Sequence, residues 1–144
     1  MKSLTPMLNF SGQCAQAIEL YEKAFGGRVV VKVLYSDANP KDFICKEDEK
    51  DYIFHCQMKI GDQLIYMADD SNKVLSNEPG GPAGNSSMMN ICMGFDTDDD
   101  VKAAYKIMAD GAKVIVPMHS TTYSTCYVFL IDKFGIGWEL MTDK

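Results

Sequence analysis

The chain contains two histidines, His55 and His119, and each stands where an imidazole could take part in chemistry. His55 lies in an alternating run, 52–60, on the same face as Gln57 and Lys59. An imidazole there can act as a general base, although a hydrogen-bonded or solvent-facing strand residue fits the pattern too. His119 falls in a polar segment, 117–123, which predicts either a ligand contact or a plain turn.

Three other motifs do not have the context that their chemistry requires. Ser120 is close to His119, but no GxSxG turn is present, so the sequence does not indicate a serine hydrolase. The acidic run 96–100 has neither the glycine nor the closing glutamate of an EF-hand, and it favours the start of a helix. The glycine-rich stretch 78–84 has no GK[ST] ending, so we interpret it as a linker and not as a phosphate-binding loop.

Composition excludes several classes of function. A length of 144 residues fits a single domain, and the formal net charge of −6 with scattered basic residues argues against a nucleic-acid partner. Five cysteines without a CxxC pair are typical of core thiols in a reducing cytoplasm. The sequence opens without an apolar leader and has no run long enough to span a membrane, so we expect a soluble, cytoplasmic protein.

Hydrophobic periodicity predicts eight strands and two helices. The first helix is expected to be capped by Ser11 and to end at Gly26-Gly27, and the second to follow the acidic run and close at Gly111. The expected strands cover residues 5–10, 28–35, 52–60, 63–69, 88–95, 113–118, 122–132 and 136–142.

The two halves of the chain repeat the same order of elements. An offset of 85 carries Phe10 to Phe95 and Gly26 to Gly111, and an offset of 73 aligns 66–70 with 139–143. A match that includes a strand end, a helix and its terminating glycine indicates a duplicated βαβββ module. We therefore expect one domain, 1–144, with a first module at about 1–70, a linker at 70–87 and a second module at about 88–144.

Two separated motifs resemble a known family. The segment Asn9–Gly27 resembles the opening of the PhnB-like branch of the vicinal-oxygen-chelate (glyoxalase/bleomycin-resistance/dioxygenase) superfamily, and Asp132–Leu140 resembles its closing DxFGxxW motif. The resemblance implies an α+β fold in which two pseudo-symmetric βαβββ modules form a curled eight-stranded mixed sheet with helices on its outer face. It also implies a cavity lined by the sheet and a homodimer.

In metal-dependent members of this family, four ligands come from the first and fourth strands of the two modules. The repeat places those positions at Thr5, Tyr66, Asn90 and Glu139. Only Glu139 is a good ligand for a divalent ion, because the other three are weak neutral donors. We therefore expect no cofactor and an incomplete metal site, with a divalent metal on Glu139 as the alternative.

Two hypotheses follow from the loss of three of the four metal-binding side chains. In the first, the protein binds a small, partly apolar molecule, and Glu139 anchors its polar or cationic group. In the second, it is a glyoxalase- or dioxygenase-like enzyme in which Glu139 and His55 are catalytic, Glu139 acting as a metal ligand supported by His55 or His119, or as a base. The residues expected to contact a ligand are Thr5, Met7, Tyr66, Asn90, Cys92, His119 and Glu139.

Overall fold

The computed structural model describes residues 1–70 and 89–144. The chain divides into two compact units, Met1–Ser76 and Asn77–Lys144. Each unit contains the element order strand, helix, strand, strand, strand, so the predicted α+β class with two βαβββ modules is confirmed. The predicted linker, 70–87, lies outside the described residues except for Asp70.

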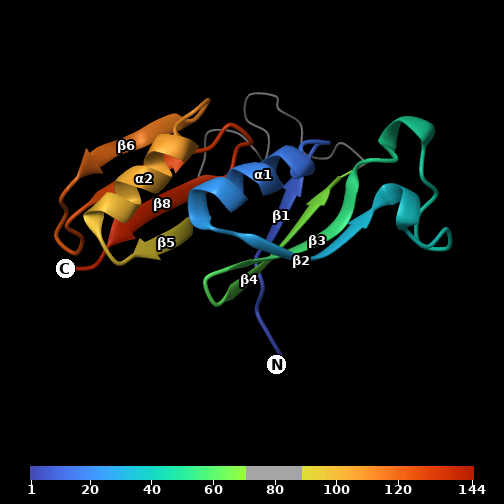
Figure 1. Cartoon of the computed structure of the whole chain (residues 1–144), viewed down its shortest axis with the longest axis horizontal. Coiled ribbons are helices and arrows are strands. Elements are labelled where there is room, and N and C mark those ends of the chain that lie inside the picture. Colours follow the sequence, from blue (N-terminus) through green and yellow to red (C-terminus); the bar gives the residue numbers. More distant parts are fainter. Residues whose placement is uncertain (71–88) are drawn as a thin grey trace. The chain divides into compact units, whose positions relative to one another are not determined.

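The first module forms a four-stranded mixed sheet (Figure 1). Its elements are β1 (Met7–Phe10), α1 (Cys14–Phe25), β2 (Arg28–Leu34), β3 (Ile53–Ile60) and β4 (Gln63–Asp69). The strand order is β1-β4-β3-β2, with β1 parallel to β4 and the other pairs antiparallel.

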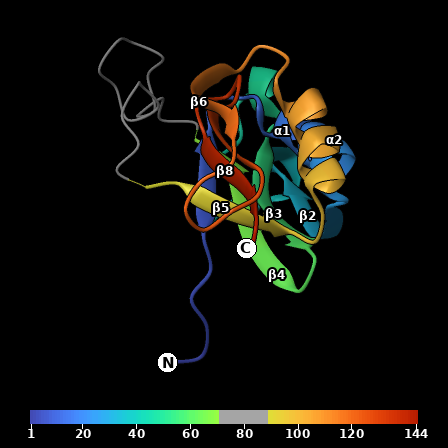
Figure 2. The ribbon, with the colours of Figure 1, turned by 90° about the vertical axis from the view of Figure 1, so that its left-hand side faces the viewer.

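The second module repeats this sheet, and Figure 2 shows its β8 between β5 and β6. Its elements are β5 (Ile91–Phe95), α2 (Asp98–Met108), β6 (Lys113–His119), β7 (Tyr127–Ile131) and β8 (Gly137–Thr142). The strand order is β5-β8-β7-β6, again with one parallel pair, β5 with β8.

The register of the parallel pairs shows that the two modules are equivalent. Met7 pairs with Tyr66 across β1 and β4, and Cys92 pairs with Glu139 across β5 and β8. These pairs are related by the offsets of 85 and 73 found in the sequence, so the internal alignment is confirmed. The eight strands lie in two four-stranded sheets, and their predicted curling stays a prediction.

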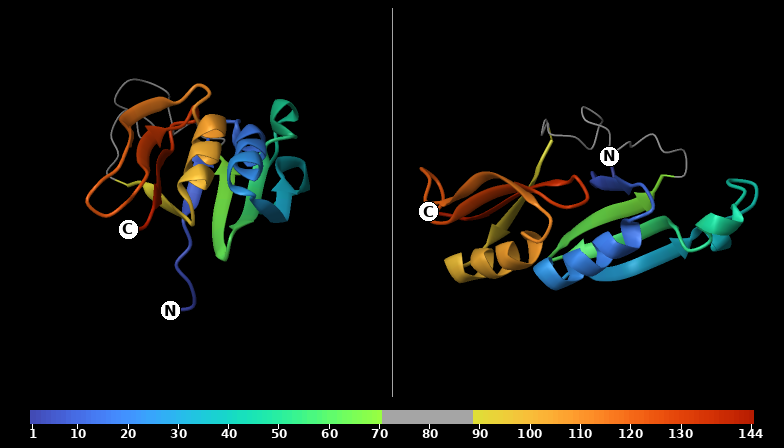
Figure 3. Two further views of the ribbon diagram at one scale, coloured as in Figure 1. Left: turned by 60° about the vertical axis from the view of Figure 1, so that its left-hand side comes forward. Right: turned by 90° about the horizontal axis from the view of Figure 1, so that it is seen from above.

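Each helix packs on one face of the sheet in its own module (Figure 3). In the first module, α1 contacts β3 and β4, and the fully buried side chains include Cys56, Met58 and Met67. In the second, α2 contacts β5 and β8, and Trp138 and Leu140 are fully buried, as their alternation with Glu139 predicted. The apolar cores therefore come from alternate residues of the strands.

The start of α1 differs from the prediction. Gln13 occupies the N-cap position without a side-chain hydrogen bond, so the predicted cap by Ser11 is wrong. The Asp69 carboxylate accepts hydrogen bonds from the backbone N–H of Cys14 and of Ile53, both at 2.9 Å. The buried carboxylate of Asp69, at the end of β4, therefore accepts the free N–H at the start of the helix that Ser11 was expected to accept. At the other end, Gly26 takes the left-handed conformation at φ 67° and ends the helix as predicted.

The start of α2 agrees with the prediction from the acidic run. Thr97 is the N-cap, and its hydroxyl accepts a hydrogen bond from the Asp100 backbone N–H at 3.1 Å. Asp98, Asp99 and Asp100 occupy the first turn, where the partial positive charge of a helix N-terminus favours carboxylates.

Some strand boundaries were predicted too long. The chain before β7 forms a loop in which the Ser124 hydroxyl donates to the Cys126 carbonyl at 2.9 Å and the Thr125 and Thr142 hydroxyls lie 2.6 Å apart. Hydroxyl groups that bond to nearby atoms in this way compete with a strand ladder. The second module's first strand begins at Ile91 and not at 88, and β6 extends to His119, one residue further than predicted.

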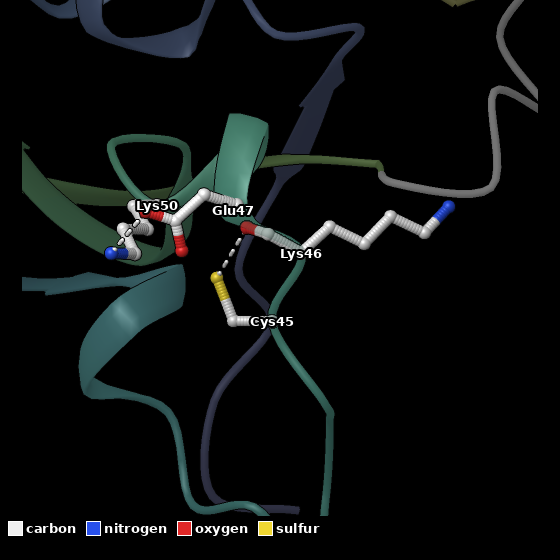
Figure 4. A network of polar contacts seen from close by, with 4 residues as sticks. All are labelled: Cys45, Lys46, Glu47 and Lys50. Carbon is white, nitrogen blue, oxygen red and sulfur yellow. Dashed lines mark hydrogen bonds and ion pairs between the residues drawn. The ribbon is translucent and has the colours of Figure 1, made fainter.

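The connection between β2 and β3 carries a surface ion pair (Figure 4). Lys50 Nζ lies 2.7 Å from Glu47 Oε1, and the nearby Cys45 thiol donates to the Lys46 carbonyl at 3.2 Å. Exposed pairs of this kind contribute about 0–1 kcal/mol to stability. We therefore give it no role beyond local order.

Among the described residues, neither helix has the length and apolar character needed to cross a membrane.

Candidate functional site

The candidate site is built around Glu139 in the middle of β8. Glu139 pairs with Cys92 of β5 on one side and with Phe129 of β7 on the other. Paired residues project to the same face of a sheet, and Tyr127 and Met141, two residues along their strands, share that face. We call the side formed by Cys92, Tyr127, Phe129, Glu139 and Met141 the Glu139 face.

Both oxygens of the Glu139 carboxylate accept hydrogen bonds from side chains. The Tyr127 hydroxyl donates to Oε1, and the Cys92 thiol donates to Oε2 at 3.3 Å. Burial raises the pKa of Tyr127, partial desolvation of the otherwise exposed Cys92 raises that of its thiol, and the hydrogen bond to Glu139 raises both further. Both groups therefore stay protonated at neutral pH and act as neutral donors to the carboxylate.

Two further rings lie against Tyr127. The ring centroids of His119 and Tyr123 are 5.9 Å and 6.3 Å from that of Tyr127, both edge-to-face. His119 Nδ1 lies 2.8 Å from the Pro117 carbonyl oxygen, which can only accept, so Nδ1 carries a proton. The Tyr123 side chain is exposed, so an aromatic surface is available next to Tyr127, the residue that donates to the carboxylate.

The remainder of the Glu139 face is apolar. Tyr127, Phe129 and Ile131 form a buried cluster along β7, and Val116 and Met141 pack against it. Ligand sites combine a few orienting polar groups with a mostly apolar lining, and this face offers one carboxylate beside an apolar cluster.

Asn90 lies just before β5, at the edge of this group. Its side-chain oxygen Oδ1 is buried and makes no hydrogen bond, and a Cβ placed on Gly137 would lie 2.5 Å from it. The glycine therefore leaves the space that this amide occupies. A buried acceptor without a partner is uncommon and costs stability.

The first module carries a different set of side chains at the equivalent positions. Tyr66 takes the position of Glu139, with Met7 beside it in β1 and Gln57 in β3. The rings of His55 and Tyr66 have centroids 5.0 Å apart, and Gln57 Nε2 lies 3.0 Å from His55 Nε2. This cluster has no carboxylate.

The predicted site residues therefore fall into two groups, one in each module. Cys92, Glu139 and His119 lie in or beside the Glu139 face, and Met7, Tyr66 and His55 lie in the first module. Thr5 stands two residues ahead of Met7, before β1 begins. Their roles in ligand binding or catalysis stay predictions.

Sequence reasoning missed Tyr127 and Tyr123. The segment 117–123 was predicted as a possible turn, but the strand was predicted to begin at 122, so the continuation of the loop to the start of β7 at Tyr127 was not recognised. Tyr127 could have been found from the repeat, since the register places it at the position of His55: Gln57 pairs with Tyr66 as Phe129 pairs with Glu139. The equivalence of β3 and β7, which the repeat implies, would have predicted that Tyr127 lies at this site.

The residues present do not fit the divalent metal site that the family resemblance implies. The two Glu139 oxygens are engaged by donors that keep their protons, and the nearby Asn90 is a neutral donor to a metal. Within residues 1–70 and 89–144, no three His, Cys, Asp or Glu side chains gather as a metal site would need. We therefore derive no chemistry through a metal.

The closing DxFGxxW motif has a structural role. The Asp132 carboxylate accepts from the backbone N–H of Phe134 at 2.9 Å and of Ile136 at 3.0 Å, and from the Trp138 indole N–H at 2.9 Å. Gly135 has a φ of 95°, which favours glycine at this turn. The motif therefore fixes the β7–β8 hairpin and so the position of Glu139 relative to β7.

Comparison with known proteins gives relatives across the whole chain. The protein YjdN of Escherichia coli K12 is 22% identical over 154 residues, covering 98% of this chain and 95% of the relative. The structure of PA1353 from Pseudomonas aeruginosa superposes with a TM-score of 0.79 at 21% identity, covering 99% and 98% of the two chains. The structure of the PhnB protein from Bacillus cereus gives a TM-score of 0.77 at 20% identity, covering 98% and 99%.

At this level of identity the two structures show a shared fold, and the family itself is shown by a sequence comparison. The sequence model of one family matches residues 6–140, nearly the full length. The chain therefore belongs to the Glyoxalase/Bleomycin resistance protein/Dioxygenase superfamily.

Proposed function

We propose that this protein binds a small, partly apolar molecule on the Glu139 face and that Glu139 is its polar anchor. One observation carries the proposal: the carboxylate is held by two neutral donors, Tyr127 and Cys92, next to an apolar cluster. A carboxylate fixed in this way is oriented before a ligand arrives, which lowers the entropy cost of binding. The cavity expected from the family is part of this proposal.

The electrostatic surroundings of Glu139 support the same function. Within the described residues, no lysine, arginine or histidine forms an ion pair with Glu139. The side chain is half-buried, so the charge is only partly solvated. A half-buried charge without a counter-ion favours a ligand that brings a complementary group.

The alternative, a metal-dependent glyoxalase- or dioxygenase-like enzyme, has no comparable support. It needs additional anionic or imidazole ligands around Glu139, and the donors in contact with that carboxylate are a phenol and a thiol that hold their protons. Roles for His55 and Glu139 as catalytic bases, the expected homodimer and the cytoplasmic location stay predictions.

A thermal-shift screen of a charge-diverse set of small molecules tests the proposal, with the full-length protein and the variant Glu139→Gln. The matched control is Glu19→Gln, which makes the same substitution at an exposed carboxylate on α1. Loss of an interaction with a charged group costs about 1.5–3 kcal/mol, so affinity for the ligands found should fall roughly 10- to 150-fold in Glu139→Gln. The control should keep wild-type affinity. Equal affinity of all ligands for wild type and Glu139→Gln would overturn the proposal.

A further inference from the structure

The charge of Glu139 is not balanced by its neighbours, and this limits the kind of ligand that fits. Tyr127 and Cys92 orient the carboxylate by hydrogen bonds but bring no positive charge. The groups whose charges act on Tyr127 are Glu139, Tyr123 and Cys92, all of them acids. An anionic ligand would therefore be repelled, whereas a cation would be attracted.

The aromatic surface beside the carboxylate limits the ligand further. The interplanar angles to Tyr127 are 83° for His119 and 79° for Tyr123, so each of these rings meets Tyr127 edge-to-face. The face of an aromatic ring attracts a cation that lies within about 6 Å of its centroid. Tyr123 is 57% exposed, so its ring is accessible to a ligand.

The geometry points to an organic monocation, a protonated amine or quaternary ammonium group carried by an apolar body. This inference rests on the proposed function and names the ligand class of that site. The cationic group lies between the Glu139 carboxylate and the ring of Tyr123, and the body contacts the apolar side that includes Met141.

An organic cation suits this site better than a compact metal ion does. A metal dication needs several oxygen or nitrogen ligands to replace its hydration shell, and the site supplies one carboxylate. A quaternary ammonium group spreads its charge over its alkyl carbons and is weakly hydrated, whereas a protonated amine can donate hydrogen bonds directly to the carboxylate. One carboxylate and a few rings can therefore offset the desolvation of either group. The ammonium group of such a ligand then matches the carboxylate and the rings, and its apolar body matches the apolar cluster.

The inference also predicts which internal contact changes on binding. Cys92 is exposed and its thiol bond to Glu139 is long, at 3.3 Å, whereas the Tyr127 ring is buried. A protonated amine that donates to Oε2 therefore displaces the Cys92 thiol, and the Tyr127 bond to Oε1 remains. Bound ligand should cover the Cys92 sulfur and slow its alkylation.

The test uses four probes of one shape class with different charges: benzyltrimethylammonium, benzylammonium, neutral benzyl alcohol and anionic phenylacetate. Affinity is measured by ligand-observed NMR titration of the full-length protein, and protection of Cys92 from iodoacetamide is followed by peptide mass spectrometry. We expect both cations to bind at least about tenfold more tightly than benzyl alcohol, phenylacetate not to bind, and the cations to protect Cys92.

Three variants locate the effect. Glu139→Gln should remove the preference for cations, Tyr123→Ala should weaken cation binding about threefold or more, and Glu19→Gln, which neutralises an exposed carboxylate on α1, should change neither. Tyr123 is exposed, so its replacement leaves the core intact. A preference for cations that persists in Glu139→Gln, or binding indifferent to Tyr123, would overturn the inference.

Two outcomes separate this inference from the proposed function. If benzyl alcohol and the cations bind equally and both protect Cys92, the cation class is wrong and binding on the Glu139 face stands. If none of the four probes binds, the cation class is again wrong, and the charge-diverse screen decides the proposed function.

Discussion

Replacement of Asp132 by alanine tests whether the closing motif holds the candidate site in place. Asp132 is 3% exposed, and its carboxylate accepts three hydrogen bonds, two from the backbone of the β7–β8 turn and one from the Trp138 indole. The alanine variant leaves these three buried donors without their acceptor. The turn that sets the pairing of β7 with β8 would then be loosened.

The magnitude follows from the number of bonds lost. A hydrogen bond to a charged acceptor contributes about 1.5–3 kcal/mol, and three bonds to one carboxylate are not fully additive. We therefore expect Asp132→Ala to lower the free energy of unfolding of the second module by about 4 kcal/mol. A loss of this size lowers the melting temperature by about 8–16 °C.

Urea unfolding followed by tryptophan fluorescence measures this effect. Trp138 is the one tryptophan of the chain and lies in β8, so its signal reports the second module. The control is Asp110→Ala, which removes an exposed carboxylate and should change stability by less than about 0.5 kcal/mol. A loss below about 1 kcal/mol in Asp132→Ala would show that the motif does not hold the hairpin.

Three further predictions concern single side chains. Glu139→Gln should speed alkylation of Cys92 by iodoacetamide at pH 7.5, because the variant removes the hydrogen bond and charge that, after burial, raise the pKa of that thiol. Burial raises the pKa of Asp69, so the folded state holds its proton more tightly than the unfolded state does. The contribution of Asp69 to stability should therefore fall as pH rises upward from its ordinary pKa, and urea unfolding followed by circular dichroism should show this slope in wild type but not in Asp69→Asn. Gly12→Ala should cost about 1–3 kcal/mol in the same assay, because Gly12 has a φ of 88° and a Cβ there would lie 2.7 Å from the Tyr52 hydroxyl.

Each of these predictions has its own control. Cys45 is a partly exposed thiol in the first module, and its alkylation rate should not respond to Glu139→Gln. An unchanged or slower rate at Cys92 would contradict the assigned contact. Stability differences between wild type and Asp69→Asn that are constant across pH would contradict the raised pKa. Gly26 has a φ of 67°, but a Cβ there would meet open space, so Gly26→Ala should lower the free energy of unfolding less than Gly12→Ala does. The reverse order would show that the contact with Tyr52 is not what destabilises Gly12→Ala.

Local pattern and the internal repeat were enough to predict the modules. The alternation from 53 to 60, the glycine at position 26 and the acidic run before α2 each act through neighbours in the sequence. The offsets of 85 and 73 then aligned Met7 with Cys92 and Tyr66 with Glu139, as the strand register confirms.

Features that depend on distant contacts could not be predicted in this way. The N-terminus of α1 is satisfied by Asp69, which is 55 residues from Cys14, and no local signal identifies that partner. The residues before β7 were predicted as a strand, but the hydroxyls of Ser124 and Thr125 bond to that of Thr142. Because the predicted strand began at 122, the contact of Tyr123 with Tyr127 and that of Tyr127 with Glu139 were missed too.

Isothermal titration calorimetry of the chelator-treated, untagged protein with Zn²⁺, Ni²⁺ and Mn²⁺ most directly tests the claim that Glu139 anchors an organic ligand and not a metal. The same titrations are made with Glu139→Gln. We expect no one-site binding at micromolar or tighter affinity that depends on Glu139, because both oxygens of the carboxylate are held by protonated donors. One-site binding in that range that Glu139→Gln abolishes would contradict the account and identify Glu139 as a metal ligand.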